Sequence, residues 1–277
     1  MLGAIIGDVV GSRYEFYNYR GKDFELFHPV CRFTDDTVCT MAVAKTLIDH
    51  YPIEYSDEYL EIVKNDLIAN LVKFGRNYPD RGYGSKYFKW LHGVNGYKPY
   101  NSFGNGSAMR VSSVGWLANS EKEVKILSKL TAEVTHNHKE GIKGAEAVAM
   151  CIYLARIGKT KKEIKEYIYE YYYPEINYFK YEELRKTNTF DVTCQGSVPE
   201  AIYCFLISKS FTDAIKIAIS IGGDSDTIAC MAGSIAEAYY KDKTNIDSLT
   251  KRLYKEVEIP EEFKEIINKF LEITAKV

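Results

Sequence analysis

The sequence predicts an all-α protein, a compact multi-helix bundle in which residues 1–277 form a single domain. Two observations lead to this prediction. Apolar residues recur at intervals of three and four along most of the chain, which is the period of a helix with one buried face. Alternating apolar and polar strands, and the dipeptides that close hairpins, are hard to find. With 46% hydrophobic and 27% charged residues, the chain can form one ample core.

The predicted helices follow one another along the chain. The first carries Gly3, Gly7 and Gly11 at every fourth position, which gives it a smooth face for close packing. Residues 36–50 and 225–240 each begin with acidic and hydroxyl side chains and continue with apolar and small ones, so we interpret both as helices with one apolar face. The other predicted helices span 58–74, 121–134, 140–157, 161–172, 198–208, 211–220, 247–256 and 260–273.

Two segments interrupt the helical pattern. Residues 75–107 collect glycine, asparagine, proline and aromatic residues. This composition is expected where the backbone must approach a ligand closely and rings must stack on it. Residues 171–197 continue a tyrosine-rich stretch at 167–181, and we interpret them as a surface loop without a functional role.

Charge and composition exclude several classes of function. The formal net charge of -2 gives no concentrated basic excess, so stable nucleic-acid binding is not expected. The apolar N-terminal run is short and contains Asp8, so it predicts neither a membrane span nor a signal peptide. The six cysteines form no CxxC pair and are expected to be reduced. We therefore expect a cytoplasmic protein that does not contact membranes, with a monomer as the default state.

The chemistry is concentrated in two short phrases, FTDDT at residues 33–37 and GGDSDT at residues 222–227. Each lies where a predicted helix begins. A single Asp, Ser or Thr at such a position usually caps the helix, because its oxygen accepts hydrogen bonds from free backbone N–H groups. Two carboxylates in each phrase exceed the need of one cap, and an all-oxygen set suits Mg²⁺ or Mn²⁺ better than zinc. The spacing alone leaves both readings open: two separate caps, or a shared pair of cations.

Seven phrases in order along the chain carry a family resemblance: GDVVGSRYEF, FTDDT, RGYG, SFGNGSAMR, EVTHNHKEG, GSVPEAIYCFL and IGGDSDTIA. Together they resemble the ADP-ribosylglycohydrolase family, which includes the dinitrogenase-reductase-activating glycohydrolases and the vertebrate ADP-ribosylhydrolases. The resemblance extends over residues 3–238. It implies an all-helical fold with two divalent cations, Mg²⁺ or Mn²⁺, at the bottom of a cleft.

The resemblance assigns the two acidic phrases to the two cations. Each phrase would hold one ion, and one aspartate would bridge the pair. The implied ligands are Thr34, Asp35 and Asp36 for the first ion and Asp224 and Thr227 for the second, with Asp226 bridging.

The catalytic group is implied in the same way. Glu15 matches the glutamate that acts as acid and base in the branch that cleaves serine-linked and poly-ADP-ribose. In the arginine-cleaving branch an aspartate of the metal cluster, here Asp35 or Asp36, is thought to act instead. Glycosidic cleavage passes through an oxocarbenium-like state and needs proton transfer to the leaving group, which Glu15 would supply. Without the resemblance, Glu15 would be taken for an exposed loop carboxylate.

Further residues are implied to contact the diphosphate and ribose of the ligand. Tyr97 lies where a ring that stacks on adenine would come, or else it packs on its own neighbours. Lys86 replaces an expected glycine, and either weakens the backbone cradle or adds a charge for phosphate. Arg110 is expected to pair with a nearby carboxylate. The other implied contacts are Gly82, Gly84, Ser102, Phe103, Asn105, Gly106 and His136.

The sequence therefore predicts a metal-dependent hydrolase that releases ADP-ribose from an ADP-ribosylated protein, small molecule or nucleic acid. Glu15 favours O-linked carriers, and an arginine-linked carrier is the alternative. Two other classes of function remain: a metal-dependent nucleotide phosphohydrolase, and a non-catalytic protein that only binds ADP-ribose. The second is disfavoured because both acidic phrases are complete.

Overall fold

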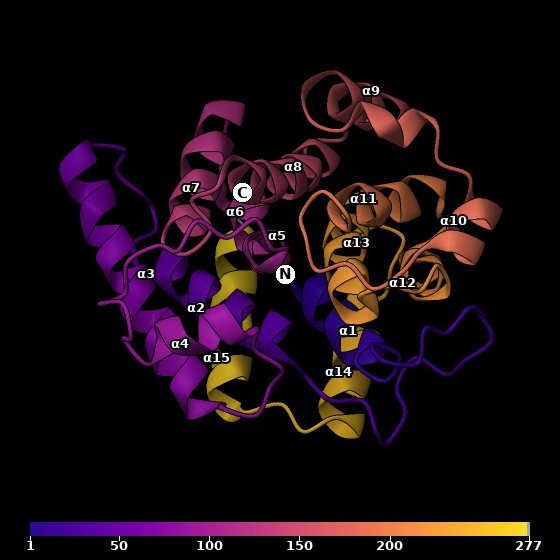
Figure 1. Cartoon of the computed structure of the whole chain (residues 1–277), viewed down its shortest axis with the longest axis horizontal. Helices are drawn as coiled ribbons and strands as arrows, with labels where there is room; N and C mark the ends of the chain where they lie inside the picture. Colours follow the sequence, from indigo (N-terminus) through magenta and orange to yellow (C-terminus); the bar gives the residue numbers. More distant parts are fainter. Residues whose placement is uncertain (276–277) are drawn as a thin grey trace.

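Two helices at the centre of the protein, α1 (Leu2–Gly11) and α13 (Ser225–Tyr239), lie directly against each other (Figure 1). The structure is a computed structural model and describes residues 1–275. Every residue of α1 is buried, including Asp8. The two helix backbones approach so closely that position 7 requires glycine, because a methyl group on Gly7 would overlap the carbonyl oxygen of Ala229. The close packing predicted from the glycines at every fourth position is confirmed.

Gly7→Ala should destabilise the protein by about 1–3 kcal/mol, because the added methyl group forces α1 away from α13. The loss exceeds the gain of about 1 kcal/mol that alanine usually brings to a helix. Urea unfolding followed by circular dichroism measures the difference. Gly84→Ala is the matched control, since a Cβ there meets nothing within 4 Å. Equal stability of the two variants would contradict the packing argument.

The remaining helices surround this central pair. α2, α3, α4 and α15 form one side of the molecule, α5 to α8 cover one end, and α9 to α12 form the other side (Figure 1). Their bounds are α2 Asp35–Asp49, α3 Asp57–Asn77, α4 Ser85–Leu91, α5 Gly106–Met109, α6 Ser112–Leu117, α7 Glu121–Glu133, α8 Lys139–Arg156, α9 Lys161–Tyr171, α10 Tyr181–Thr187, α11 Val198–Ile207, α12 Phe211–Ser220, α14 Ile246–Glu256 and α15 Glu261–Thr274.

The all-α prediction is confirmed, and the long helices begin and end close to where their apolar period predicts. The two segments interpreted as loops contain more structure than expected. Residues 75–107 include α4, and residues 171–197 include α10 and a 3₁₀ turn at Pro174–Asn177. Helix α6 was also missed. These helices have seven residues or fewer, which is too short for the apolar repeat to show itself twice.

One hydrophobic cluster extends through the described residues and contacts most of the helices. The six cysteines are all free and buried, where they pack as small apolar side chains. Among residues 1–275, no helix combines the length and the hydropathy that a bilayer crossing would need.

Candidate functional site

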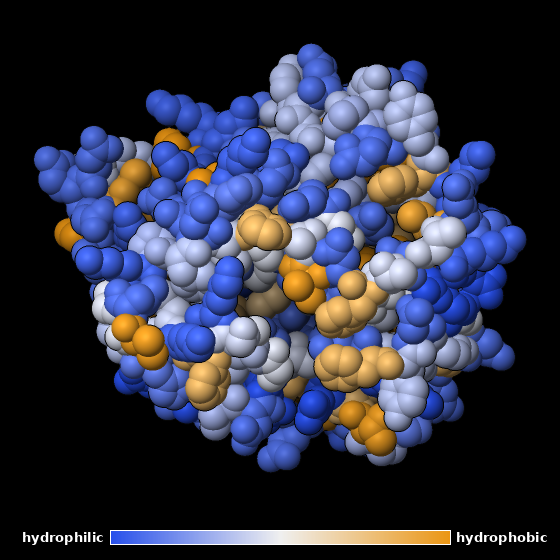
Figure 2. Space-filling model, viewed as in Figure 1, coloured by the Kyte–Doolittle hydropathy of each residue, from blue (hydrophilic) through white to orange (hydrophobic). Residues whose placement is uncertain are grey.

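Both acidic phrases line one cleft, which has a volume of about 550 Å³. This is within the range of small-molecule sites, whereas a second cavity, beside Gly75 and His92, holds only about 60 Å³. The cleft opens where a hollow bordered by apolar side chains is visible near the middle of one face (Figure 2). The starts of α2, α4 and α13 reach it, together with residues 102–110 and 190–193.

The start of α2 is anchored by a residue that the sequence analysis mentioned only as an interruption of an apolar run. Asp8 on α1 accepts hydrogen bonds from the backbone N–H groups of Thr34 and Thr37, at 3.0 and 3.1 Å, and from both hydroxyl groups. Thr34 in turn caps α2, since its hydroxyl oxygen accepts from the N–H of Asp36 at 3.3 Å. Asp8 thereby fixes the direction in which Asp35 and Asp36 leave the helix.

The start of α13 depends on two consecutive glycines. Gly222 and Gly223 have φ values of +69° and +84°, in the left-handed region that other residues rarely adopt. The tight turn they allow directs Asp224 into the cleft, where its Oδ2 accepts a hydrogen bond from Asn105 Nδ2 at 2.7 Å. Thr227 connects the two phrases, because its hydroxyl donates to Asp36 Oδ2 at 3.2 Å.

The carboxylates form two groups that share one residue. Asp8, Asp36 and Asp226 have oxygens within 4.8 Å of one another, and so do Glu15, Asp224 and Asp226. Asp226 belongs to both groups, which suits an aspartate that bridges two cations. Among residues 1–275, the buried Oδ1 of Asp36 has no hydrogen-bond partner, and a bound cation would supply one. The donor set is all oxygen and therefore fits Mg²⁺ or Mn²⁺.

This concentration of negative charge shifts the acidity of the cluster. Burial, with the charges of neighbouring aspartates as the second cause, raises the pKa of Asp36 and Asp226 well above the ordinary value. Glu15 is half-buried at the edge of the cluster. Burial and the charges of Asp224 and Asp8 raise its pKa to about 7. Without a cation, the folded protein favours protonated carboxyl groups at this site.

The stabilisation by divalent cations should therefore grow with pH. A carboxyl group whose pKa is raised by folding contributes stability while it is protonated, and this contribution disappears as the pH rises, for Glu15 between 4.5 and about 7. A bound cation balances the charge of the ionised carboxylates in place of the protons. With the cation bound, the protein therefore keeps its stability as the pH rises. Melting temperatures measured with EDTA and with excess Mg²⁺, in mildly acidic and mildly alkaline buffers, test this. A difference that shrinks with rising pH would contradict the assignment of the cluster to a cation.

Basic and neutral donors line the same cleft as the carboxylates. Lys86 and Arg110 are among its lining residues, and His136 lies beside Gly104 and Gly106. A cleft that carries both carboxylates and basic side chains suits a ligand that joins a cation-binding part to an anionic part. The predicted ligand contacts that line the cleft are Gly82, Gly84, Ser102, Phe103, Asn105, Gly106 and His136.

Three further residues have contacts that bear on their expected roles. For Tyr97 two roles were left open, and its contacts favour packing on its own neighbours. Tyr97 does not line the cleft: its hydroxyl accepts from Arg76 at 2.8 Å and its ring meets Trp90 edge to face, so it packs on its neighbours. Tyr100 lines the cleft instead. Thr34 is buried and its hydroxyl donates to Asp8, so its role as a cation ligand stays a prediction.

The third is Arg110, for which the prediction of a carboxylate partner was wrong. Its Nη2 donates to the carbonyl oxygen of Thr131 at 2.7 Å and to the hydroxyl of Thr135 at 2.8 Å. Among the described residues it forms no salt bridge. The oxygens within reach of its guanidinium group belong to Thr131 and Thr135, so uncharged acceptors take the place of a carboxylate.

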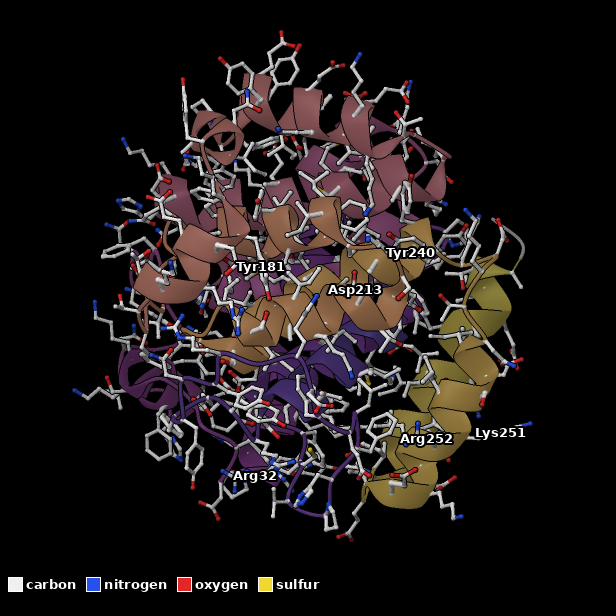
Figure 3. The ribbon with its side chains drawn as sticks, turned by 90° about the vertical axis from the view of Figure 1, so that its right-hand side faces the viewer. Arg32, Tyr181, Asp213, Tyr240, Lys251 and Arg252 are labelled. Carbon is white, nitrogen blue, oxygen red and sulfur yellow. The ribbon has the colours of Figure 1, made fainter. Side chains whose placement is uncertain are left out.

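The segment interpreted as a surface loop forms a wall of the cleft, which corrects that interpretation. It is fixed to the body of the protein: the hydroxyl groups of Tyr181 on α10 and Ser220 on α12 lie 2.7 Å apart (Figure 3). Beyond α10, Phe190 and Val192 reach the cleft beside Phe16. Phe16 is 79% exposed and Phe190 51%, which is unusual for phenylalanine. Nothing in the local sequence indicates this apolar rim, because tertiary contacts create it.

The sequence of this chain is similar to those of known proteins. The family model described as ADP-ribosylglycohydrolase matches residues 1–276. The chain is similar to the ADP-ribosylhydrolase ARH3 of Mus musculus, at 28% identity, with 87% of this chain and 82% of the relative covered. For ARH3 of Homo sapiens the identity is 27%, with 87% and 84% covered.

Two further matches are informative. The ADP-ribosylarginine hydrolase Tri1 of Pseudomonas putida is 24% identical, over 87% of this chain and 69% of Tri1. A solved structure, an ADP-ribosylglycohydrolase-related protein complex, superimposes with a TM-score of 0.73 over 99% of this chain and 97% of the other. At 19% identity this last likeness shows the fold alone.

Proposed function

The chain belongs to the ADP-ribosylglycohydrolase family, and from that premise we propose that it releases ADP-ribose from O-linked carriers with the help of two Mg²⁺ or Mn²⁺ ions. As a member of the family it is a glycosidic-bond hydrolase. The proposal concerns the linkage, the ions and the residues. The observation that supports it most directly is the pair of carboxylate groups sharing Asp226, with Glu15 in one of them.

The acidic residues of the cleft would have different roles in holding the two cations. Asp36 and Asp226 would hold one cation, and Asp224 and Asp226 the other, with Asp35 and Thr227 beside them. Bound there, the ions would supply positive charge that orients the ribose hydroxyl groups. Asp8 has all its hydrogen bonds directed at the start of α2, so we assign it to positioning the ligands.

Glu15 would move a proton at the anomeric carbon. It lies at the edge of the carboxylate cluster, and its pKa of about 7 lets it be present in both protonation states near neutral pH. A group with this property can donate a proton to the leaving oxygen and accept one from the attacking water. A serine or ester oxygen needs this help, and the resemblance of the GDVVGSRYEF phrase to the serine-cleaving branch agrees with it.

An arginine-linked carrier is the second candidate. The similarity to Tri1, whose name describes an ADP-ribosylarginine hydrolase, favours it. In that case Asp35, which lines the cleft near Gly82, is a candidate for the catalytic group. The two candidates differ in the residue that carries the proton, so one set of variants distinguishes them.

The test is a release assay with Ser-linked and Arg-linked ADP-ribosyl peptides, each with Mg²⁺, with Mn²⁺ and with EDTA, and with free ADP-ribose detected by mass spectrometry. We expect cation-dependent release from the serine peptide. Release from the arginine peptide alone would overturn the O-linked proposal. Phosphate or AMP in place of intact ADP-ribose would indicate a nucleotide phosphohydrolase. Tight ADP-ribose binding without release from either peptide would indicate another linkage or a protein that only binds the ligand.

A further inference from the structure

Arg110 lines the cleft, but the proposed function assigns no task to its buried side chain. Arg110 is 1% exposed and forms no salt bridge with a described carboxylate, and its Nε lacks any partner. A charge buried in this way is costly unless it is used. Its Nη2 donates to the hydroxyl oxygen of Thr135 at 2.8 Å, and Thr135 itself is fully buried. The chain of contacts continues from Thr135 to the cleft.

The hydroxyl group of Thr135 connects Arg110 to His136. The hydroxyl oxygen of Thr135 lies 2.7 Å from Nδ1 of His136. A hydroxyl group has one hydrogen to donate, and Arg110 has no acceptor to offer it. Among the described residues, Nδ1 is the acceptor within reach of that hydrogen. The hydroxyl therefore accepts from Arg110 and donates to Nδ1, which must be unprotonated, so the hydrogen of the imidazole ring lies on Nε2.

Nε2 faces the cleft. His136 lines the cleft, and a methyl group on Gly106 would lie 3.1 Å from Nε2, while one on Gly104 would lie 3.6 Å away. No described protein atom accepts a hydrogen bond from Nε2, whereas Nη2 of Arg110, the hydroxyl of Thr135 and Nδ1 of His136 all have partners. Burial, with the nearby charge of Arg110 as the second cause, lowers the pKa of His136 well below its ordinary value, so the ring is neutral.

We infer that Arg110 and Thr135 are positioning residues that hold His136 in its Nε2–H form and direct this hydrogen at a phosphate oxygen of the bound ligand. Phosphate is the acceptor that suits an N–H donor here, because Arg110 and Lys86 also line the cleft and supply positive charge. The identity of the ligand rests on the proposed function, whereas the form of the ring does not depend on it.

Nitrogen-15 spectra of histidine-labelled protein test the form of the ring directly. The chain has five histidines, and His136→Gln identifies the signal by its loss. In the ligand-free protein we expect the hydrogen on Nε2. Thr135→Val removes the hydroxyl and should shift hydrogen to Nδ1, whereas Thr135→Ser keeps the hydroxyl and should preserve the wild-type spectrum. If Thr135→Val does not fold, Thr135→Ala takes its place. A hydrogen on Nδ1 in the wild type would overturn the inference.

Calorimetry with ADP-ribose and with adenosine tests the role in binding. We expect Thr135→Val to weaken ADP-ribose about tenfold, the value of one lost hydrogen bond to a charged acceptor, and Thr135→Ser to restore it. Adenosine, which has no phosphate, should bind both variants equally. An equal loss for adenosine, or failure of Thr135→Ser to restore binding, would overturn the positioning role. If the wild type does not bind ADP-ribose, the proposed function and the phosphate acceptor both fail, while the spectra still decide the form of the ring.

Discussion

Asp226→Asn should abolish cation-dependent hydrolysis and at the same time raise the melting temperature of the metal-free protein. Asp226 is the member common to both carboxylate groups, so its loss weakens both proposed cation sites. Changes to residues that merely support a metal ligand cost about 10–100-fold in affinity, and loss of a shared ligand should cost at least the upper value. Stability should rise because burial and the neighbouring charges make Asp226 bind a proton on folding, whereas asparagine is neutral in the folded and the unfolded protein alike.

Two measurements on this variant should change in opposite directions: the cation affinity should fall, and the melting temperature of the metal-free protein should rise. Isothermal titration with Mn²⁺ measures the affinity, and thermal unfolding in EDTA measures the stability, for which about 2–4 °C corresponds to each kcal/mol in a chain of this size. Asp23→Asn is the matched control, because Asp23 is exposed and outside the cleft. If Asp226→Asn lowered the melting temperature of the metal-free protein, the cluster would be stabilised by something other than cations.

Glu15→Gln should reduce turnover by about 10²–10⁴-fold, the usual contribution of a general acid or base, while ADP-ribose binding stays within a few-fold of the wild type. Glutamine keeps the size and the hydrogen-bonding capacity of the side chain but cannot exchange a proton. The pH profile of turnover in the wild type should also bend below 7, because bound cations lower the pKa of about 7 that Glu15 has in the metal-free protein, and this inflection should be missing in the variant.

Single-turnover release of ADP-ribose from the serine peptide, with binding measured separately, distinguishes these effects. Glu25→Gln provides the control, since Glu25 is an exposed glutamate that does not reach the cleft. Full activity of Glu15→Gln on the serine peptide would remove Glu15 from the reaction. If Asp35→Asn then lost turnover on the arginine peptide, the second candidate function would replace the first.

The sequence was most informative where a local pattern repeats. Long helices such as α3 and α8 show their apolar period several times, so their positions followed from the sequence alone. The two acidic phrases were also recognisable, because surplus carboxylates at a helix start are a local feature. Short helices such as α4 and α10 were missed, since a single period cannot be distinguished from chance.

What the sequence could not reveal depends on contacts between distant residues. Asp8 looked like an interruption in an apolar run, and its function appears only once α2 is seen to start beside it. Phe190 follows a tyrosine-rich stretch with no local pattern, and it reaches the cleft because α10 is held against α12. An acidic residue within an otherwise apolar helix is a local feature of the sequence that can indicate such a role, as the two acidic phrases do.

The contact between α1 and α13 has a consequence for how this protein can change. A side chain larger than hydrogen at Gly11 would overlap the backbone of Asp226, so the same surface that packs the two helices also sets the depth of the shared carboxylate. A substitution that loosens the packing of α1 against α13 therefore also displaces the carboxylate of Asp226. Mutations accumulated over time, or introduced to make the enzyme more robust, should be accepted on outer helices such as α3 and α14 and rejected along this seam.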